Sequence, residues 1–498
     1  MARAMPFGQG AAGFALGLLS LLCGSGVVIA QTATVTLGTE KQYIRGLGGM
    51  AHAAWAGDLT AAQRTTAFGN ADGQLGLSAL RIPVSDGSPD SANVATAKAA
   101  IANGAIVFAT PWNARGAMSS SAFASYATHL NDFTTYLKNQ GVNLYAIGVQ
   151  NEPDYGSQGG WRTWTAAQCH DFVSSYGAMI STKLISCESF NYSKSYYDPI
   201  LDDAAALANL SVIGTHLYGT PVSGYPYALF DQKGAGKERW MTEHYTDSTT
   251  DANSWPNALG VATELHHAMV DAQFNLYTWW YIVRSYGLIS TNGAVSKRGW
   301  CMAHFSKFIR PGFYRVDATA APASGVFLSA YKGASDVVVV IVNTNTSSAS
   351  LNVSINGSAV SGSAVSSFDR FTTSGSKSFA NDGKVTASNG SLSLTLDSQS
   401  VTTLHGAGMA TGGTGGADGT GGRGAGGSTG SGGSPVSADA SMDSDGNPAP
   451  GESSGASGCN CELGRGARAS TSLASSTVFG ALALVSARRR RRLGARRS

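Results

Sequence analysis

The sequence predicts an α/β fold in which a (β/α)8 TIM barrel carries an attached all-β sandwich, and three observations support this fold class. Eight short apolar segments alternate with longer helical patterns between residues 44 and 280, the order expected of a barrel built from β/α repeats. A region of about 270 residues also has the length of one such barrel. From Gly312 onward, strand patterns follow one another with Ser, Asn and Gly turns and no intervening helix pattern, which predicts the sandwich.

The barrel is assigned to residues 43–315, where apolar runs of strand length alternate with segments whose apolar residues recur at helical spacing. The predicted strands are 44–50, 77–83, 104–110, 143–149, 183–188, 211–217, 238–243 and 273–280. The predicted helices are 59–73, 92–102, 121–140, 165–181, 201–208, 226–233 and 256–271.

The sandwich is assigned to residues 316–406, and a short earlier strand is placed in the same domain. Its predicted strands are 326–331, 337–342, 351–355, 391–396 and 401–404. The strand pattern at 32–37 has no place in an eight-stranded barrel. We therefore expect segment 31–42 to pair with the sandwich.

Both ends of the chain have compositions unlike those of a folded domain. Residues 1–30 have a basic start, an apolar centre and a small-residue cleavage pattern, which are typical of a secretory signal peptide. Residues 407–458 are almost entirely small and polar, so they are predicted to form a flexible linker. Residues 459–498 contain a Cys-Asn-Cys motif, a short apolar stretch and an arginine cluster.

This last order of features resembles the MYXO-CTERM sorting tails of myxobacterial surface proteins. The resemblance implies a chain that is secreted or displayed at the cell surface, with attachment to the cell envelope through the tail. A simple tail anchor and a basic tail that binds nucleic acid are the alternatives.

The positive charge of the chain lies in that tail. The full chain has a net charge of +3, whereas residues 31–406 alone have a net charge of about −2. A weakly acidic core gives no indication of a nucleic-acid partner. Its three cysteines, Cys169, Cys187 and Cys301, match no metal-ligand spacing and allow at most one disulfide, so we expect them to be structural. No metal or other cofactor is expected.

Two glutamates stand at predicted strand ends on opposite sides of the barrel. Glu152 follows the fourth strand in an Asn-Glu-Pro motif, where Pro153 predicts an extended conformation for the glutamate before it. Glu243 ends the seventh strand. Active sites of such barrels lie at the carboxyl ends of the strands, and a facing pair of carboxylates is what glycoside hydrolysis requires. A separation of about 5 Å predicts the retaining route.

Their surroundings suggest how the two roles divide. We expect Glu152 to be the acid/base, because burial and the charge of Glu243 both favour its protonated form. We expect Glu243 to be the nucleophile, with Tyr245 and His216 close enough to hydrogen-bond it. Asn151 is expected to hold the sugar 2-hydroxyl. Further substrate contacts are expected from aromatic residues at the strand ends, Trp55, Trp112, Tyr218 and Trp280. We expect a structural or hydrogen-bonding role for Glu188, and a surface or packing position for His266 and His267.

Several motifs together resemble the bacterial glucuronoxylanases of glycoside hydrolase family 30, subfamily 8. They are Val149-Gln150-Asn151-Glu152-Pro153-Asp154-Tyr155, Gly214-Thr215-His216-Leu217-Tyr218-Gly219, Trp240-Met241-Thr242-Glu243 and Trp279-Trp280-Tyr281, together with Arg284-Ser285-Tyr286-Gly287. The resemblance implies a retaining endo-β-1,4-xylanase that requires a 4-O-methylglucuronic acid branch on xylan, with Glu152 as acid/base and Glu243 as nucleophile. It also implies that the glucuronate carboxylate is bound by Arg284 with Tyr281, Tyr286, Tyr245 and Ser248.

The chain departs from this family pattern at three places. Val283 replaces the first of two consecutive arginines, His244 follows the nucleophile where an apolar residue is expected, and segment 113–121 is short. Because that segment would line the substrate cleft, we expect its length to affect distal sugar binding more than the chemistry. The alternatives left open are a related retaining glycosidase, acting on linear xylan, β-1,6-glucan or glucosylceramide, and a non-catalytic surface carbohydrate-binding protein. The expected partner is glucuronoxylan, and the expected state is a monomer.

Overall fold

The computed structural model describes residues 30–113, 120–246, 250–357 and 365–407. The predicted signal peptide, apart from Ala30, and the predicted linker and tail, apart from Ala407, lie outside these ranges. Within them, no helix combines the length and the apolar character needed to cross a membrane.

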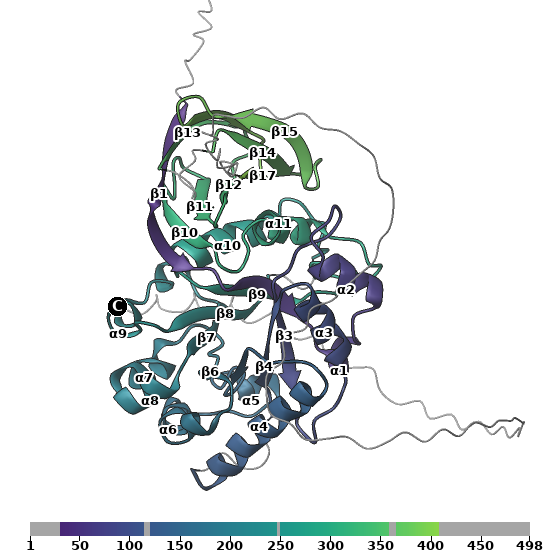
Figure 1. Cartoon of the computed structure of the whole chain (residues 1–498), viewed down its shortest axis with the longest axis vertical. Helices are drawn as coiled ribbons and strands as arrows, with labels where there is room; N and C mark the ends of the chain where they lie inside the picture. The colour runs from purple at the N-terminus through teal and green to yellow at the C-terminus, as the bar shows by residue number, and fades with distance from the viewer. Residues whose placement is uncertain (1–29, 114–119, 247–249, 358–364, 408–498) are drawn as a thin grey trace, which may run out of the picture. The chain divides into compact units, whose positions relative to one another are not determined.

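Eight parallel strands, β2 to β9, close into a barrel in sequence order, which confirms the predicted fold class (Figure 1). The strands are β2 Gly46–Met50, β3 Ala79–Val84, β4 Ile106–Pro111, β5 Ala146–Gly148, β6 Lys183–Ile185, β7 Val212–His216, β8 Glu238–His244 and β9 Leu276–Tyr281. Each predicted barrel strand overlaps one of these. The parallel order brings all eight carboxyl ends to the same rim of the barrel.

The interior of the barrel changes character along its axis. Near the amino-terminal ends of the strands it is filled by apolar side chains, which form one buried cluster: Ala79, Phe108, Ala146, Ile185, Val212, Trp240 and Leu276. The rings of Phe108 and Trp240 lie 5.3 Å apart. Because this end is filled with apolar side chains, polar side chains with a function are confined to the opposite rim.

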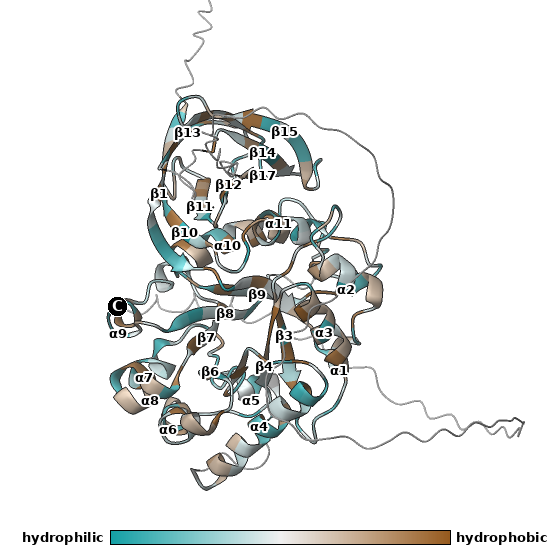
Figure 2. Cartoon of the chain, viewed as in Figure 1, coloured by the Kyte–Doolittle hydropathy of each residue, from teal (hydrophilic) through white to brown (hydrophobic). Residues whose placement is uncertain are grey.

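Helices connect the barrel strands, and hydrophobic and hydrophilic residues alternate along them (Figure 2). They are α1 Ala53–Ala56, α2 Ala61–Phe68, α3 Val94–Ala102, α4 Phe123–Asn139, α5 Gly156–Gly159, α6 Ala166–Tyr176, α7 Asp198–Asp202, α8 Ala204–Asn209, α9 Ala228–Lys233, α10 Leu259–Val270 and α11 Lys297–Ser306. Thr60 and Thr165 begin α2 and α6 with capping boxes. The predicted helix 59–73 is too long, since α2 ends before Gly69.

The sequence-based prediction missed the long helix α11, besides the four-residue helices α1 and α5. Ser296 caps α11 by accepting a hydrogen bond from the Gly299 amide. Eight of its ten residues are buried, including Arg298 and His304, so the helix lacks the polar face that gives a readable periodicity. Gly299 inside the helix weakens the pattern further.

A second, sheet-rich domain follows the barrel, which agrees with the predicted all-β domain. Its nine strands form one continuous sheet in the order β15-β14-β17-β12-β11-β10-β1-β13-β16. The strands are β1 Gln31–Tyr43, β10 Tyr314–Ala318, β11 Val326–Lys332, β12 Asp336–Asn343, β13 Ala349–Asn356, β14 Ser367–Thr373, β15 Ala380–Thr386, β16 Ser391–Leu396 and β17 Ser400–Ala407. Residues from both halves of this sheet share a single hydrophobic core.

The first strand, β1, lies inside this sheet rather than at its edge. It pairs antiparallel with β10, where Val35 faces Ala318, and parallel with β13, where Val35 faces Ile355. Three strands of this domain, β10, β14 and β15, were not predicted. β15 is mostly exposed and lies at the edge of the sheet, and a register shift between Asp369 and Phe371 breaks the two-residue period of β14.

Two histidines are buried where barrel helices contact the sheet-rich domain. His304 of α11 hydrogen-bonds the hydroxyls of Thr403 and Thr373 at 2.8 and 2.9 Å. His266 of α10 packs against the ring of Phe327, 5.2 Å away. Burial lowers the pKa of each imidazole to about 3, so both are neutral in the folded protein at ordinary pH.

Cys169 of α6 and Cys187, which follows β6, form a disulfide. Cys301 is buried with a free thiol. The sequence allowed one pair among these three residues without saying which.

Candidate active site

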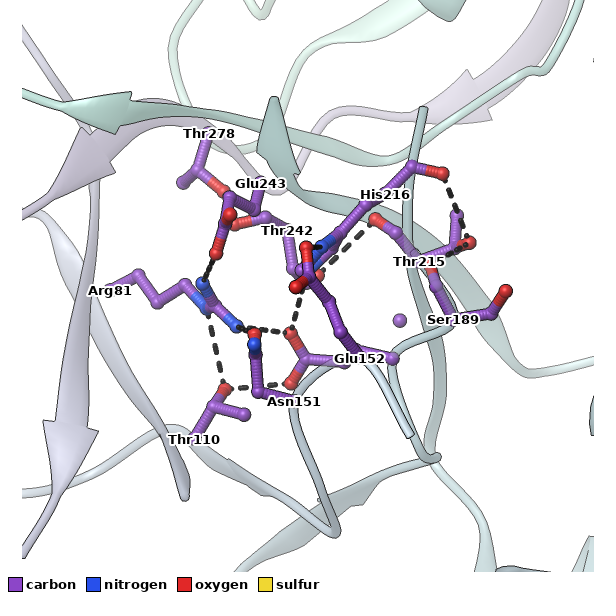
Figure 3. Close-up of polar contacts among 12 residues, drawn as sticks. Arg81, Thr110, Asn151, Glu152, Ser189, Thr215, His216, Thr242, Glu243 and Thr278 are labelled. Carbon is purple, nitrogen blue, oxygen red and sulfur yellow. Dashed lines mark hydrogen bonds and ion pairs between the residues drawn. The ribbon is translucent and has the colours of Figure 1, made fainter. Parts of the chain in front are cut away.

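Buried polar residues converge at the carboxyl ends of the barrel strands, from both sides of the barrel (Figure 3). β3 supplies Arg81, β7 supplies His216 and β8 supplies Glu243, and the segments after β5 and β6 supply Asn151, Glu152 and Glu188. All six are at most 5% exposed. Such a concentration of buried charge is costly unless each group is paired.

The two glutamates predicted to be catalytic face each other across this rim. A carboxylate oxygen of Glu152, a carboxylate oxygen of Glu243 and a ring nitrogen of His216 all lie within 4.8 Å of one another. This separation suits the retaining arrangement, in which the carboxyl groups are about 5–5.5 Å apart.

The backbone of Glu152 differs from the sequence-based expectation. Its φ is 40°, in the left-handed region, instead of the extended conformation that Pro153 predicted. A left-handed glutamate is uncommon and strained. Surrounding hydrogen bonds hold it there: its amide donates to the Glu188 carbonyl at 2.8 Å, and its carbonyl accepts from the Tyr155 amide at 3.1 Å.

Glu152 is in an environment that keeps it protonated. Burial, and then the negative charge of Glu243, raise the pKa of Glu152 to about 7. His216 lies 2.9 Å from the carboxylate and, together with Arg81, opposes this rise. A carboxyl group with this pKa is able to give up and take back a proton near neutral pH.

The hydrogen-bond partners of Glu243 are partly other residues than those predicted. The Arg81 guanidinium donates to one of its oxygens at 2.5 Å, and the Tyr218 hydroxyl donates to the other at 3.0 Å. His216 was expected beside Glu243 but hydrogen-bonds Glu152 instead, because its ring faces the segment after β5. The ring of Tyr245 meets that of Tyr218 edge to face, with ring centroids 5.5 Å apart.

Arg81 is the central cation of the site and was not among the predicted site residues. Besides Glu243, it donates to Asn151 Oδ1 and to Glu188 Oε2, both at 2.7 Å. Burial alone would raise the pKa of Glu188. The charge of Arg81, with help from His216 and Thr110, outweighs this effect and lowers the pKa of Glu188 to about 2. The expectation that Glu188 is a hydrogen-bonding residue agrees with these contacts. Arg81 was visible as a polar residue at a strand end, but its partners come from three other strand ends.

Asn151 presents a free donor to the site. Its oxygen accepts from Arg81, which orients the amide group. Its buried Nδ2 has no partner among the residues that the structure describes. A buried N–H group without a partner is costly unless a bound molecule accepts from it.

The predicted aromatic residues form a cluster beside the carboxylates. Trp112, Trp280 and Tyr281 are buried in one group with Met50. Trp55 lies against the same group and is 50% exposed, with its ring stacked on His52 at 3.8 Å. An exposed indole fixed by stacking offers a flat apolar face for a sugar ring.

Arg284 lies next to this cluster. Its guanidinium carbon is 4.5 Å from the centroid of the Tyr281 ring, and Nη2 donates to the Trp55 carbonyl at 3.1 Å. A cavity of about 300 Å³ is lined by Arg284, Tyr281, Val283 and His52, among others. The side chain of Tyr286 packs near Tyr245, with rings 5.1 Å apart. Ser248, also predicted to bind substrate, lies outside the described residues.

His244, one of the departures from the family pattern, has its side chain paired with a residue of α10. Its Nδ1 pairs with Glu264 at 2.8 Å, and Glu264 also accepts from the Tyr277 hydroxyl. Segment 113–121, the short segment, is described only at its ends.

Glu152, His216 and Glu243 are also close enough to be considered as metal ligands. Each is already engaged, since His216 and Glu152 hydrogen-bond each other and Glu243 accepts from Arg81. A guanidinium bonded to the carboxylate would repel a cation there. The arrangement therefore favours proton transfer and nucleophilic attack over metal binding.

A (β/α)8 barrel with two facing glutamates after its fourth and seventh strands defines a glycoside hydrolase. The chain is 48% identical over 408 residues to the glucuronoxylanase XynC of Bacillus subtilis (strain 168), across 78% of this chain and 95% of that protein. Because the two proteins are this similar over nearly the whole length of XynC, the chain belongs to the glucuronoxylanases of glycoside hydrolase family 30. No family model matches the sequence.

Solved structures agree with this assignment. A family 30 endoxylanase from Clostridium papyrosolvens C71 is 37% identical, with a TM-score of 0.69 over 76% of this chain and 100% of that structure. A family 30 subfamily 8 xylanase from Clostridium acetobutylicum is 33% identical, with a TM-score of 0.68 over 76% of this chain and 99% of that structure. Both matches extend well beyond the length of the barrel.

Proposed function

We propose that this protein is a retaining endo-β-1,4-xylanase that cleaves xylan carrying 4-O-methylglucuronic acid branches. The observation that carries the proposal is the approach of the Glu152 and Glu243 carboxylates to within 4.8 Å, inside a chain that is 48% identical to a glucuronoxylanase. That separation leaves no room for the water of an inverting enzyme between the two groups.

In the first step, the Glu243 carboxylate attacks the anomeric carbon of a xylose unit while Glu152 gives its proton to the glycosidic oxygen. The glycosidic bond breaks, and a covalent glycosyl-enzyme forms at Glu243. In the second step, Glu152 takes a proton from water, and the water oxygen attacks the same carbon and frees Glu243. Arg81 and Tyr218 orient the nucleophile by donating to its two oxygens.

We assign substrate binding to groups that remain available around these carboxylates. The unpartnered Nδ2 of Asn151 suits a sugar 2-hydroxyl, whose hydrogen bond strengthens in the transition state. Trp55 offers its exposed face to a xylose ring. Arg284 has the planar, two-pronged guanidinium that recognises a carboxylate, and its Nε has no partner among the described residues.

The decisive experiment digests glucuronoxylan and identifies the products by mass spectrometry. We expect products that each carry one glucuronate at a fixed position near the reducing end. Products cut independently of the branch would contradict the substrate proposal and favour a linear xylanase, and activity confined to β-1,6-glucan or glucosylceramide would favour the related glycosidases.

Glu152→Gln and Glu243→Gln test the enzyme proposal itself. Each change keeps the size of the side chain but removes the proton donor or the nucleophile, so release of reducing sugar should fall by at least about 100-fold. Binding of xylan by these variants should persist. If neither change lowered sugar release, a non-catalytic carbohydrate-binding protein would be the better interpretation.

We also propose that the protein is exported and displayed at or released from the cell surface, as a monomer in solution. Support comes from the signal-like composition of residues 1–30 and from the cysteine, apolar stretch and arginine cluster within 459–498. Fractionation of cells that express the full chain and a chain ending at residue 458 tests this idea. Loss of surface retention in the shorter chain supports the sorting tail, and identical distributions contradict it.

A further inference from the structure

Asp154 makes a two-point connection between the segment that carries Glu152 and the segment after β6. Its Oδ2 accepts from the Ser189 hydroxyl at 2.7 Å, and its Oδ1 accepts from the Phe190 amide at 2.9 Å. It stands two residues after Glu152 and is half-buried. Asp154 was not among the predicted site residues.

The segment after β6 is a fixed support. The Ser189 amide donates to the Tyr197 hydroxyl oxygen at 3.0 Å, and that hydroxyl donates to the Gly214 carbonyl at 3.0 Å. The Ser189 carbonyl accepts from the His216 amide at 2.9 Å. The segment is therefore fastened to β7, the strand whose His216 touches Glu152, so whatever is attached to the segment keeps its place relative to that histidine.

The segment that carries Glu152 needs such an anchor. Glu152 has a left-handed φ of 40°, which persists only where the surroundings impose it. Pro153 has no amide hydrogen to contribute. The connections to the fixed support thus lie on either side of Pro153: the Glu152 amide bonds the Glu188 carbonyl at 2.8 Å, and the Asp154 carboxylate bonds Ser189 and Phe190.

Ring stacking extends this connection towards the nucleophile. The Phe190 ring lies between Tyr155, at 4.3 Å, and Tyr218, at 4.8 Å, and is nearly parallel to both. Tyr218 in turn donates to Glu243 at 3.0 Å. One end of the stack therefore belongs to the proton-donor segment, and the other end orients the nucleophile.

We propose that Asp154 is a positioning residue for the proton donor: by clamping its segment to Ser189 and Phe190, it fixes the Glu152 main chain and holds the Glu152 carboxyl between His216 and Glu243. This inference rests on the proposed function, since it assigns Asp154 to the same reaction. Asp154 acts through Glu152 and does not touch the reacting atoms.

Removing the clamp should affect proton transfer more than binding. In Asp154→Ala, the Glu152 segment can relax from its strained conformation, and its carboxyl can move towards solvent. We expect kcat on glucuronoxylan to fall about ten-fold, as for the loss of a charge-assisted hydrogen bond. KM should change little, because the contacts of Asp154 are to Ser189 and Phe190 and not to the sugar-binding aromatic residues.

The pH profile separates positioning from general stabilisation. A Glu152 carboxyl that moves away from Glu243 and gains water loses both causes of its raised pKa. The alkaline limb of kcat/KM in Asp154→Ala should therefore move to lower pH. Ser189→Ala removes one of the two bonds and should give a smaller shift in the same direction.

Asp203→Ala is the matched control. Asp203 also accepts from a serine hydroxyl and a backbone amide, those of Ser174 and Ala205, but it caps α8 away from the strand ends. It should lower thermal stability and leave the pH profile unchanged. If Asp154→Ala does not fold, Asp154→Asn serves in its place: it keeps one oxygen for the Phe190 amide but loses the charge and the oxygen that accepts from Ser189, so its alkaline limb should move in the same direction by a smaller amount.

The inference is overturned if the Asp154 variants keep the wild-type alkaline limb, whether or not their stability or kcat falls. It is supported if the limb moves while the Asp203 control does not. Failure of the proposed function has a different signature, namely full activity in Glu152→Gln.

Discussion

Glu152 combines a strained backbone, burial and a raised pKa in a single residue. It is buried beside a second carboxylate, its backbone is left-handed, and its pKa is raised to about 7. Burial and the second carboxylate favour the protonated form of Glu152, and the left-handed backbone fixes the direction in which its side chain points. The surrounding protein compensates with hydrogen bonds to the main chain of Glu152 and with the imidazole of His216.

The alkaline limb of the activity profile should report this raised pKa. Glu152 must be protonated to act as the acid, so kcat/KM should fall as pH rises through about 7. His216 lowers the pKa of Glu152, so His216→Asn should raise that pKa and move the limb to higher pH. Steady-state kinetics over a pH series measure the effect. His267→Asn, a change at a helix-surface His–Asp pair, is the control, and an unmoved limb in His216→Asn would contradict the assignment.

Arg284 should set substrate preference and not the chemistry. Arg284→Ala should lower kcat/KM on glucuronoxylan by about 100-fold, because a charged hydrogen-bonded contact is lost, and should barely affect linear xylan. Arg284→Lys keeps the positive charge but lacks the planar guanidinium, so its kcat/KM on glucuronoxylan should lie between those of the wild type and Arg284→Ala. Assays of all three proteins on both substrates test this. Equal losses on the two polymers would contradict a role in reading the branch.

At this scale the sequence identified the residue types but not their connections. Glu152 and Glu243 could be chosen because both end predicted strands. Arg81 could not be chosen, since its charged and amide partners lie 70, 107 and 162 positions away and come from separate strand ends. Likewise, His216 hydrogen-bonds Glu152 and not Glu243 because of the orientation of its ring, which no sequence pattern encodes.

Among the elements, β6 and the segment after it do more than complete the barrel. β6 is only three residues long, yet the residues that follow it hold Glu188 against Arg81 and receive the Asp154 clamp. The disulfide from Cys187 to α6 lies directly before Glu188. A covalent link at this point compensates for the few ladder hydrogen bonds that so short a strand can make.

Removing the disulfide should therefore destabilise the barrel. The linked cysteines are 18 residues apart, and closing a loop of that size is worth about 3 kcal/mol in the chain-entropy model. The double variant Cys169→Ala and Cys187→Ala should show a clearly lower melting temperature in calorimetry. Cys301→Ala removes the free buried thiol and controls for the loss of cysteine as such. Equal melting temperatures for the double variant and the wild type would contradict this.

Elements were predictable where their periodicity was intact. All eight barrel strands could be predicted, because a strand buried on both faces reads as a continuous apolar run. α11 has too few exposed residues to show a helical period, and β15 consists largely of exposed Asn, Asp, Gly and Lys at a sheet edge. β14 is interrupted by its register shift. In each case a contact distant in the sequence compensates for a weak local signal.

On the scale of the whole molecule, the barrel and the sheet-rich domain share polar contacts that are buried or partly buried. His304 of α11 bridges Thr373 of β14 and Thr403 of β17. Lys297, at the start of α11, donates to the carbonyl of Lys377, and the Trp255 indole donates to the carbonyl of Gln399. The barrel and the sheet-rich domain therefore belong to one compact unit.

Acid should weaken this contact through its neutral histidines. The pKa of His304 is about 3 in the folded state and about 6.5 when unfolded, so the unfolded chain binds more protons between these values and stability falls as pH falls through that window. His304→Gln can still hydrogen-bond both threonines but cannot titrate, so its melting temperature should depend less on pH from 6.5 to 4. His170→Gln, at a partly exposed site, is the control. Parallel pH curves for His304→Gln and wild type would contradict the role.

The position of β1 has a consequence for how the chain is made. Val35 pairs with Ala318 and Ile355, so the first strand to leave the ribosome must wait for partners synthesised roughly 300 residues later. The entire barrel is the loop that this pairing closes. A fragment that starts after the barrel would lack an interior strand of its sheet, and a barrel fragment that keeps β1 would expose that strand's unpaired edges. The two domains are distinct in architecture, yet neither can be cut from the chain as a contiguous piece without leaving a gap in the sheet.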